Sequence, residues 1–327
     1  MAFLPTSGPL SINDINALFG RGNNLNAYKG TVYATVSGSG TFPTGAISIS
    51  NFYGTSPRVP LSYNYSTDTA NASINVSLIS GYAAGASDIT ITVNSGVYLY
   101  ATSTSLAGLV IFGATTGDTI TLVNNGYIMG QGGWGGYVGN SDINGGPALS
   151  VGFNVTINNT NASAYIGGGG GGGGAADSSP PTGFFGMGGG GAGGGNAGDP
   201  STGYISYGGA VGQVGSSGSA AAGAGGRIFP GIGGPSNTGG GAGGGGAVDT
   251  KGGSAGGGGS ANGGGGDGSG PGLNGGGGGG WGASGGNAST GNAITVSPGS
   301  GGKAVQLNGY SVSWVSGDTS RIYGAVA

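Results

Sequence analysis

The stretch TLVNNGYI at residues 121–128 indicates the fold of much of this chain, because a similar stretch occurs further along and both lead into glycine. The counterpart begins with TINN at 156–159 and continues, after a short insertion, with YIGGG at 165–169. In both copies a segment of alternating apolar and polar residues leads into an Asn-rich turn, then Tyr-Ile, then glycine. Such self-similarity is typical of stacked, solenoid-like layers, so we predict an all-β domain over residues 59–166.

The C-terminal residues 303–327 also read as β-structure. Asn308-Gly309 separates VQL at 305–307 from YSVSW at 310–314. Asn-Gly between alternating segments is the strongest short signal for a two-residue hairpin. We therefore predict that a β-hairpin and meander close the chain.

Residues 1–58 read as a small α/β module. The pattern S-x-x-D that begins at Ser11 predicts a capped helix, which should end near Phe19, before a glycine. Segments 31–36 and 46–50 alternate as strands do. Two prolines close to the end of this module indicate a linker.

Residues 167–302 hold most of the 90 glycines among the 327 residues. A collagen-like reading fails, because FPGIGGPSN at 229–237 breaks the required period of three. Two readings stay open, a flexible linker and a bundle of extended threefold helices of the polyglycine II type. Runs of glycine that recur between turn-forming islands favour the bundle. The predicted fold class is therefore mostly β with a polyglycine II-type helical bundle.

The physics of such a bundle explains why it needs glycine. An extended threefold helix makes no internal hydrogen bonds, so its N–H and C=O groups have to bond sideways. Only residues without a Cβ let neighbouring segments approach closely enough. The entropic cost of ordering glycine is high, so we expect the bundle to need clamping by the flanking β domains.

Composition excludes several classes of function. The chain has no Cys and no His, its acidic residues are all Asp, and only 5% of its residues are charged. The aspartates are scattered singly, as turn and cap formers are, so we predict no catalytic residues, no metal site and no cofactor. A net charge of −3 without a basic cluster argues against nucleic acid as a partner. No apolar run is long enough to span a membrane, and the N-terminus does not resemble a secretory signal.

Islands of aromatic residues interrupt the glycine runs and are the candidate binding residues. Aromatic side chains on a rigid support make good anchors for a partner. The alternative is that they only plug the ends of the bundle. The candidates are Phe184, Phe185, Tyr204, Tyr207, Arg227 and Phe229.

Four stretches carry a resemblance to a known family: NNGYIMG at 124–130, GGPAL at 145–149, YIGGG at 165–169, and GKAVQLNGY at 302–310. Together with the glycine runs they resemble the distal tail-fibre adhesins of T-even-type bacteriophages, over roughly residues 115–327. The resemblance implies an adhesin that binds a protein or polysaccharide receptor on the host surface through loops on a polyglycine II-type bundle. A purely structural fibre or spike component of the virion is the alternative function.

The first module departs from those adhesins and resembles a small module of other phage structural proteins. The implied layout is therefore an attachment module at 1–58, an all-β domain at 59–166, the bundle at 167–302 and a closing β segment at 303–327. The resemblance places the protein in the virion, joined to other tail or baseplate proteins, after synthesis in the host cytoplasm. Monomer and homotrimer both stay open.

Overall fold

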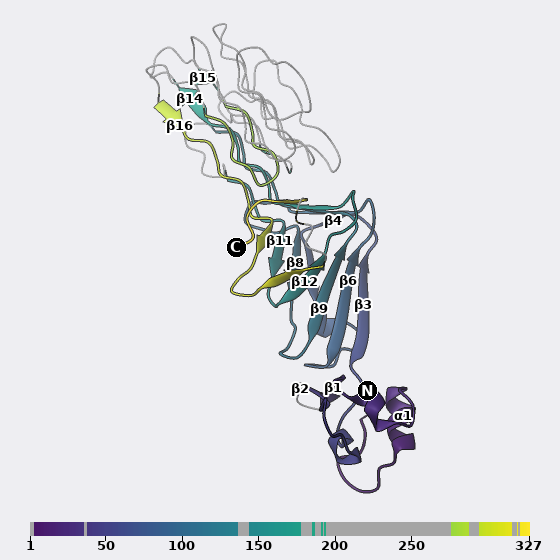
Figure 1. The fold of residues 1–327 in the computed structure, drawn as a ribbon. Coiled ribbons are helices and arrows are strands. Elements are labelled where there is room, and N and C mark those ends of the chain that lie inside the picture. Colours follow the sequence, from purple (N-terminus) through teal and green to yellow (C-terminus); the bar gives the residue numbers. More distant parts are fainter. Residues whose placement is uncertain are drawn as a thin grey trace.

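The computed structural model describes residues 3–35, 38–136, 144–177, 185–186, 191, 193, 276–287, 294–315, 319 and 321–327. Within these residues the chain is mostly β, as the sequence predicts, and contains a single α-helix beside short 3-10 helices (Figure 1). In the same part of the chain no helix is both long and apolar enough to cross a bilayer.

Three parallel sheets form the body of the molecule. The first contains, in spatial order, β3 (Val59–Tyr65), β6 (Ser87–Val93), β9 (Thr119–Asn124), β12 (Val155–Asn158) and β18 (Val312–Trp314). The second contains β4 (Thr69–Ala70), β7 (Tyr98–Tyr100), β10 (Tyr127–Met129), β13 (Tyr165–Gly167) and β19 (Ile322–Tyr323). The third contains β5 (Ala72–Asn75), β8 (Leu109–Phe112), β11 (Leu149–Val151) and β17 (Val305–Gln306).

The chain visits these sheets in rotation, so it winds as a solenoid in which each turn pairs with the turn before it. The register keeps like residues above one another: Ile91 of β6 lies beside Leu122 of β9, and both are fully buried. Period-2 alternation places these side chains inside the coil, where they form one continuous apolar core. The repeat in the sequence therefore corresponds to adjacent turns, β9–β10 and β12–β13.

The predicted C-terminal hairpin and meander are wrong. Asn308 and Gly309 do make a tight turn with positive φ, and Tyr310 N–H donates to the Leu307 carbonyl at 2.9 Å. The flanking strands β17 and β18 nevertheless join different sheets and pair in parallel with β11 and β12. The turn is a corner of the solenoid, because each flanking strand has an open parallel edge to pair with in the preceding turn.

The N-terminal residues pack around a core of their own, which contains Leu4, Ile15, Tyr28, Phe42 and Phe52. This part contains α1 (Ile12–Phe19), η1 (Leu25–Tyr28), β1 (Val32–Thr35), β2 (Gly38–Thr41) and η2 (Ile49–Phe52).

The predicted helix and its capping box are confirmed, since Ser11 and Asp14 bond reciprocally. The strand predicted at 46–50 is wrong. Ser48 N–H donates to the side chain of Asn51 at 2.8 Å and starts the 3-10 helix η2 there instead.

Candidate functional site

One corner of the solenoid, between the second and third sheets, grows longer with each turn. The connection is a single residue between β4 and β5, residues 101–108 between β7 and β8, residues 130–148 between β10 and β11, and residues 168–304 between β13 and β17. The glycine-rich segments therefore all leave the solenoid at the same place, where they lie side by side (Figure 1).

The backbone hydrogen bonds of these segments recur every third residue. Carbonyls of Gly167, Gly170 and Gly173 accept from amides of Gly130, Gly133 and Gly136, at 2.9, 2.8 and 2.7 Å. Carbonyls of Gly168, Gly171 and Gly174 accept from amides of Gly282, Gly279 and Gly276, at 2.7, 2.7 and 2.9 Å. Carbonyls of Gly169 and Gly172 accept from amides of Gly302 and Gly299, at 2.7 and 2.8 Å. Successive residues of 167–174 thus bond to three different neighbouring segments.

These contacts leave no space for side chains. A Cβ at Gly170 would overlap the carbonyl oxygen of Gly279, and one at Gly169 would overlap that of Gln131. The same holds for Gly173 against Gly276. Glycine is therefore required here by close approach of backbones, not by an unusual dihedral angle.

Tyrosines on the outer face of the second sheet tie the glycine segments to the solenoid. Tyr98, Tyr127 and Tyr165 lie in register on β7, β10 and β13, with ring centroids 4.6 and 4.8 Å apart. Trp281, from a glycine segment far along the chain, is buried beside Tyr165, and the centroids of the two rings are 5.7 Å apart. Its ring lies directly over Gly167, where a Cβ would approach it to 3.0 Å. Trp281 therefore fits a notch that glycine leaves in the sheet face.

The glycine segment 168–174 leads away from the solenoid into β14 (Ala175–Asp177), which pairs antiparallel with β15 (Phe185–Gly186) and β16 (Ile294–Val296). This small sheet lies at the end of the molecule opposite the N-terminal module (Figure 1). Of the predicted binding residues, only the backbone of Phe185 is described, in β15 opposite Asp177. Phe184, Tyr204, Tyr207, Arg227 and Phe229 lie outside the described residues.

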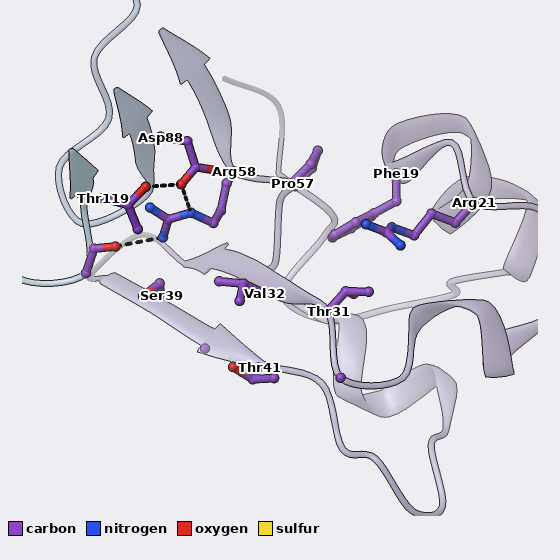
Figure 2. A pocket seen from close by; sticks show the side chains of 13 residues that line it. Phe19, Arg21, Thr31, Val32, Ser39, Thr41, Pro57, Arg58, Asp88 and Thr119 are labelled. Atoms are coloured by element: carbon purple, nitrogen blue, oxygen red, sulfur yellow. Dashed lines mark hydrogen bonds and ion pairs between the residues drawn. The ribbon is translucent and has the colours of Figure 1, made fainter. Parts of the chain in front are cut away.

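A second feature is the junction between the N-terminal module and the solenoid, where Arg58 bonds to residues of the solenoid. Its guanidinium donates to Asp88 Oδ1 and to the Gly117 carbonyl, each at 2.7 Å (Figure 2). It also donates to the Ser87 carbonyl at 2.7 Å. Asp88 also accepts from the Thr119 hydroxyl. The Arg58 side chain is 9% exposed and that of Asp88 44% exposed, so this is a partly buried ion pair with most of its donors satisfied.

The described residues contain no group of three or more His, Cys, Asp or Glu side chains placed to hold a metal ion. Asp118, the one buried carboxylate in this part of the chain, accepts hydrogen bonds from Tyr82, Ser87 and Thr115. It therefore fixes loops of the solenoid.

The family described as phage tail fibre adhesin Gp38 matches residues 60–235, which is more than half of the chain. The chain belongs to the Gp38 family of phage tail fibre adhesins. The adhesin is thus a receptor-binding protein of the virion tail fibre, as the resemblance implied. The matched range begins at the first solenoid strand and extends into the glycine-rich region, so the N-terminal module lies outside it.

Among solved structures, the adhesin is similar to the crystal structure of the gp37–gp38 adhesin tip complex of the bacteriophage S16 long tail fiber. The identity is 18%, the alignment covers 98% of this chain and 100% of that chain, and the TM-score is 0.49. No curated protein matches the sequence.

Sequence reasoning found the glycine runs and the Tyr-Ile pairs at 127–128 and 165–166, but it assigned no role to Trp281 or Arg58. A signal for the third stacked tyrosine existed, because Tyr98 also precedes an apolar residue, Leu99, on the same sheet. Trp281 stands alone among glycines, so nothing local shows which surface it covers.

Burial of Tyr165 generates a testable pH dependence. Burial raises the pKa of its phenol, and the phenol oxygen has no hydrogen-bond partner in the described structure. The fold therefore favours the protonated form, and its stability should fall as pH rises above about 10, where the unfolded tyrosine ionises. Tyr165→Phe should lose less stability than the parent between pH 9 and pH 11, measured by urea unfolding at each pH.

Tyr310→Phe is the matched control, since Tyr310 is 42% exposed and its ring neighbour is Phe153, not a buried tyrosine. The stability profile of this variant should follow that of the parent. Identical pH profiles for Tyr165→Phe and the parent would show that the buried phenol does not control alkaline unfolding.

Proposed function

We propose that the adhesin recognises its host through loops presented at the far end of a polyglycine II-type bundle, over residues 167–302, that is rooted in one corner of the solenoid. The observation that carries this proposal is the set of lateral hydrogen bonds with a period of three residues. A threefold extended helix produces this period, because every third amide points to the same neighbour. Such a bundle is stiff along its length and separates the loops from the solenoid.

The proposed binding residues are those in the aromatic islands: Phe184, Phe185, Tyr204, Tyr207, Arg227 and Phe229. The glycine segments offer a partner only backbone groups, which bond to one another in the described part. Phe185 at the base of the β14–β15 connection supports a distal position for the first island. Loops on a rigid support also tolerate sequence change without disturbing the support, which suits receptor recognition.

We propose no enzymatic activity for the adhesin. The sequence supplies no His, Cys or Glu for acid–base or nucleophilic chemistry. The buried polar groups of the solenoid, such as Asp118, bond to neighbouring loops.

We propose that residues 1–58 attach the adhesin to another protein of the tail fibre. This part has a hydrophobic core separate from that of the solenoid, and the family match begins after it. A component of a fibre has to be joined to the rest of the particle. The module lies at the opposite end of the molecule from β14 and β15, as attachment at one end and recognition at the other require (Figure 1).

The bundle predicts a strong difference between two glycine substitutions. Gly170→Ala introduces a Cβ that overlaps the Gly279 carbonyl, so it should destabilise the protein by about 1–3 kcal/mol or more. Gly45→Ala, which has nothing within 4 Å of its Cβ, should be neutral or stabilising by up to about 1 kcal/mol. Chemical denaturation of both variants measures the difference, and equal stabilities would contradict lateral packing at Gly170.

The loop proposal predicts slower adsorption to host cells. Phe184→Ala, Tyr204→Ala and Phe229→Ala should each weaken binding by about 2 kcal/mol at a hot spot, which is about thirtyfold in affinity. Adsorption of particles with confirmed adhesin content measures this, with Phe112→Ala on the solenoid surface as the control. If all three variants adsorb like the control, the islands only plug the bundle.

Attachment predicts the fate of a truncated chain. Deleting residues 1–56 retains Arg58 and its bonds to the solenoid, so the remaining chain should still fold. Particles made with this truncation should lack the adhesin, as measured by quantitative mass spectrometry of purified virions. Normal incorporation of the truncated chain would refute the role of the module.

A further inference from the structure

A row of hydroxyl side chains crosses the outer face of the first sheet, whose strands β3, β6, β9 and β12 lie side by side in Figure 1. The register aligns one such residue from each strand, pairing Ser62 with Thr90, Thr90 with Thr121, Thr121 with Thr156, and Thr156 with Ser313. On β6, β9 and β12 these residues alternate with buried side chains, so they point away from the core. Within the part of the chain that the structure describes, none of the five hydroxyls is hydrogen-bonded to another residue. The row therefore offers a ligand five groups that can each donate and accept.

The row leads into a hollow of about 460 Å³ on the same face. Thr156 and Ser313 line it, and so do residues of the turns that precede β9, β12 and β18. The rings of Phe153 and Tyr310 lie at this corner with their centroids 6.1 Å apart, and Tyr310 is 42% exposed. The volume is within the range of about 300–1,000 Å³ that ligand pockets span. The hollow thus joins hydroxyl groups to exposed aromatic surface.

The charges around the hollow narrow the class of ligand. Asp118 is the single charged residue among the described ones that line it, and its buried carboxylate accepts hydrogen bonds from Tyr82, Ser87 and Thr115. Because these lining residues include no Lys or Arg, a phosphate or carboxylate ligand would find no opposite charge there. The polar row beyond the two rings does not suit a lipid chain, and serine is depleted in protein–protein interfaces. An uncharged ligand rich in hydroxyl groups fits these constraints.

We propose that this face of the solenoid binds an uncharged polysaccharide of the host surface, which lies along the hydroxyl row and packs one sugar ring on Tyr310. Sugar hydroxyls donate and accept as Ser and Thr hydroxyls do, so each position of the row can bond to one of them. The C–H groups of a sugar ring carry a slight positive charge and suit the negative face of an aromatic ring. Neighbouring strands repeat the hydroxyl about every 4.8 Å, which suits a ligand that is itself a chain of similar units. The site is separate from the distal loops and does not depend on the function proposed for them.

The first test measures, by isothermal titration calorimetry, how the purified full-length adhesin binds polysaccharide released from the envelope of a host strain. Tyr310→Ala should weaken binding about tenfold, because the contact with the ring is lost. Thr121→Val combined with Thr156→Val should weaken it about five- to thirtyfold, because two hydroxyls are lost from the middle of the row while the β-branched shape is kept. Raising the NaCl concentration should leave the affinity unchanged, because the ligand carries no charge.

Phe3→Ala and Thr44→Val are the matched controls, since both residues are exposed, belong to the N-terminal module and do not line the hollow. Both variants should bind like the parent, and circular dichroism should show that every variant is folded. The proposal is overturned if the parent does not bind the polysaccharide, or if either the Tyr310 variant or the double threonine variant binds as the controls do. An affinity that falls steeply with salt would also overturn it, because the ligand would then be anionic.

The second test asks whether the site acts on intact particles. Virions that carry Tyr310→Ala should adsorb about tenfold more slowly than the parent to host cells, and at the parent's rate to a host mutant that lacks the surface polysaccharide. Equal adsorption of the two kinds of virion to both strains would overturn the proposal. The aromatic islands are unchanged in this variant, so the result is independent of whether the island variants lose adsorption.

Discussion

Backbone hydrogen bonding between neighbouring chain segments is the constraint on which this adhesin depends. In the solenoid the bonds join parallel strands, and in the glycine-rich part they join segments that are neither helix nor strand. Both arrangements solve the same problem, because no segment bonds within itself and every buried N–H needs a partner on another segment. The difference is in what fills the remaining space. Side chains such as Ile91 and Leu122 fill the solenoid, whereas backbone alone fills the contact between Gly170 and Gly279.

The solenoid also explains where the long insertions are placed. Each turn repeats the same three sheets, so an insertion at one corner lies above the insertion at the same corner of the preceding turn. Residues 130–148 and 168–304 therefore leave the coil next to each other. Trp281 reinforces this arrangement, since it returns from the glycine segments to cover Gly167 and packs on Tyr165.

Periodicity in the sequence predicted the stacked turns of the solenoid. The pairing of the C-terminal strands could not be predicted in this way, because it depends on residues far apart in the chain. The Tyr-Ile copies at 127–128 and 165–166 lie in register on neighbouring strands, as stacked layers require. Asn308-Gly309 has the turn chemistry of a hairpin and makes a tight turn, but local chemistry does not specify whether the two flanking strands pair with each other. Here Val305 and Val312 pair with Leu149 and Val155 of the previous turn.

The candidate sites, too, could be predicted from local sequence only in part. The glycine runs are visible as composition, and the need for glycine follows from close backbone contact. Arg58 stands alone in the sequence, and its importance depends on Asp88, which the solenoid brings to it. A charge is informative only when the structure shows whether it is paired. Arg58 is paired with Asp88 and so fixes the start of β3 to the neighbouring strand, whereas Arg21 has no ion-pair partner in the described part of the chain.

The register of the solenoid makes the glycine array feasible. Ordering each residue costs about 1–2 kcal/mol in conformational entropy, glycine lies at the high end, and a hydrogen bond returns about 0.5–1.5 kcal/mol net. An isolated glycine run therefore gains too little to order itself. Here Met129 pairs with Gly167 at the ends of β10 and β13, and the next amide, Gly130, donates to the Gly167 carbonyl. The first bonds of the array are thus the last bonds of the sheet, so the solenoid sets the alignment and each later bond forms between segments already held side by side.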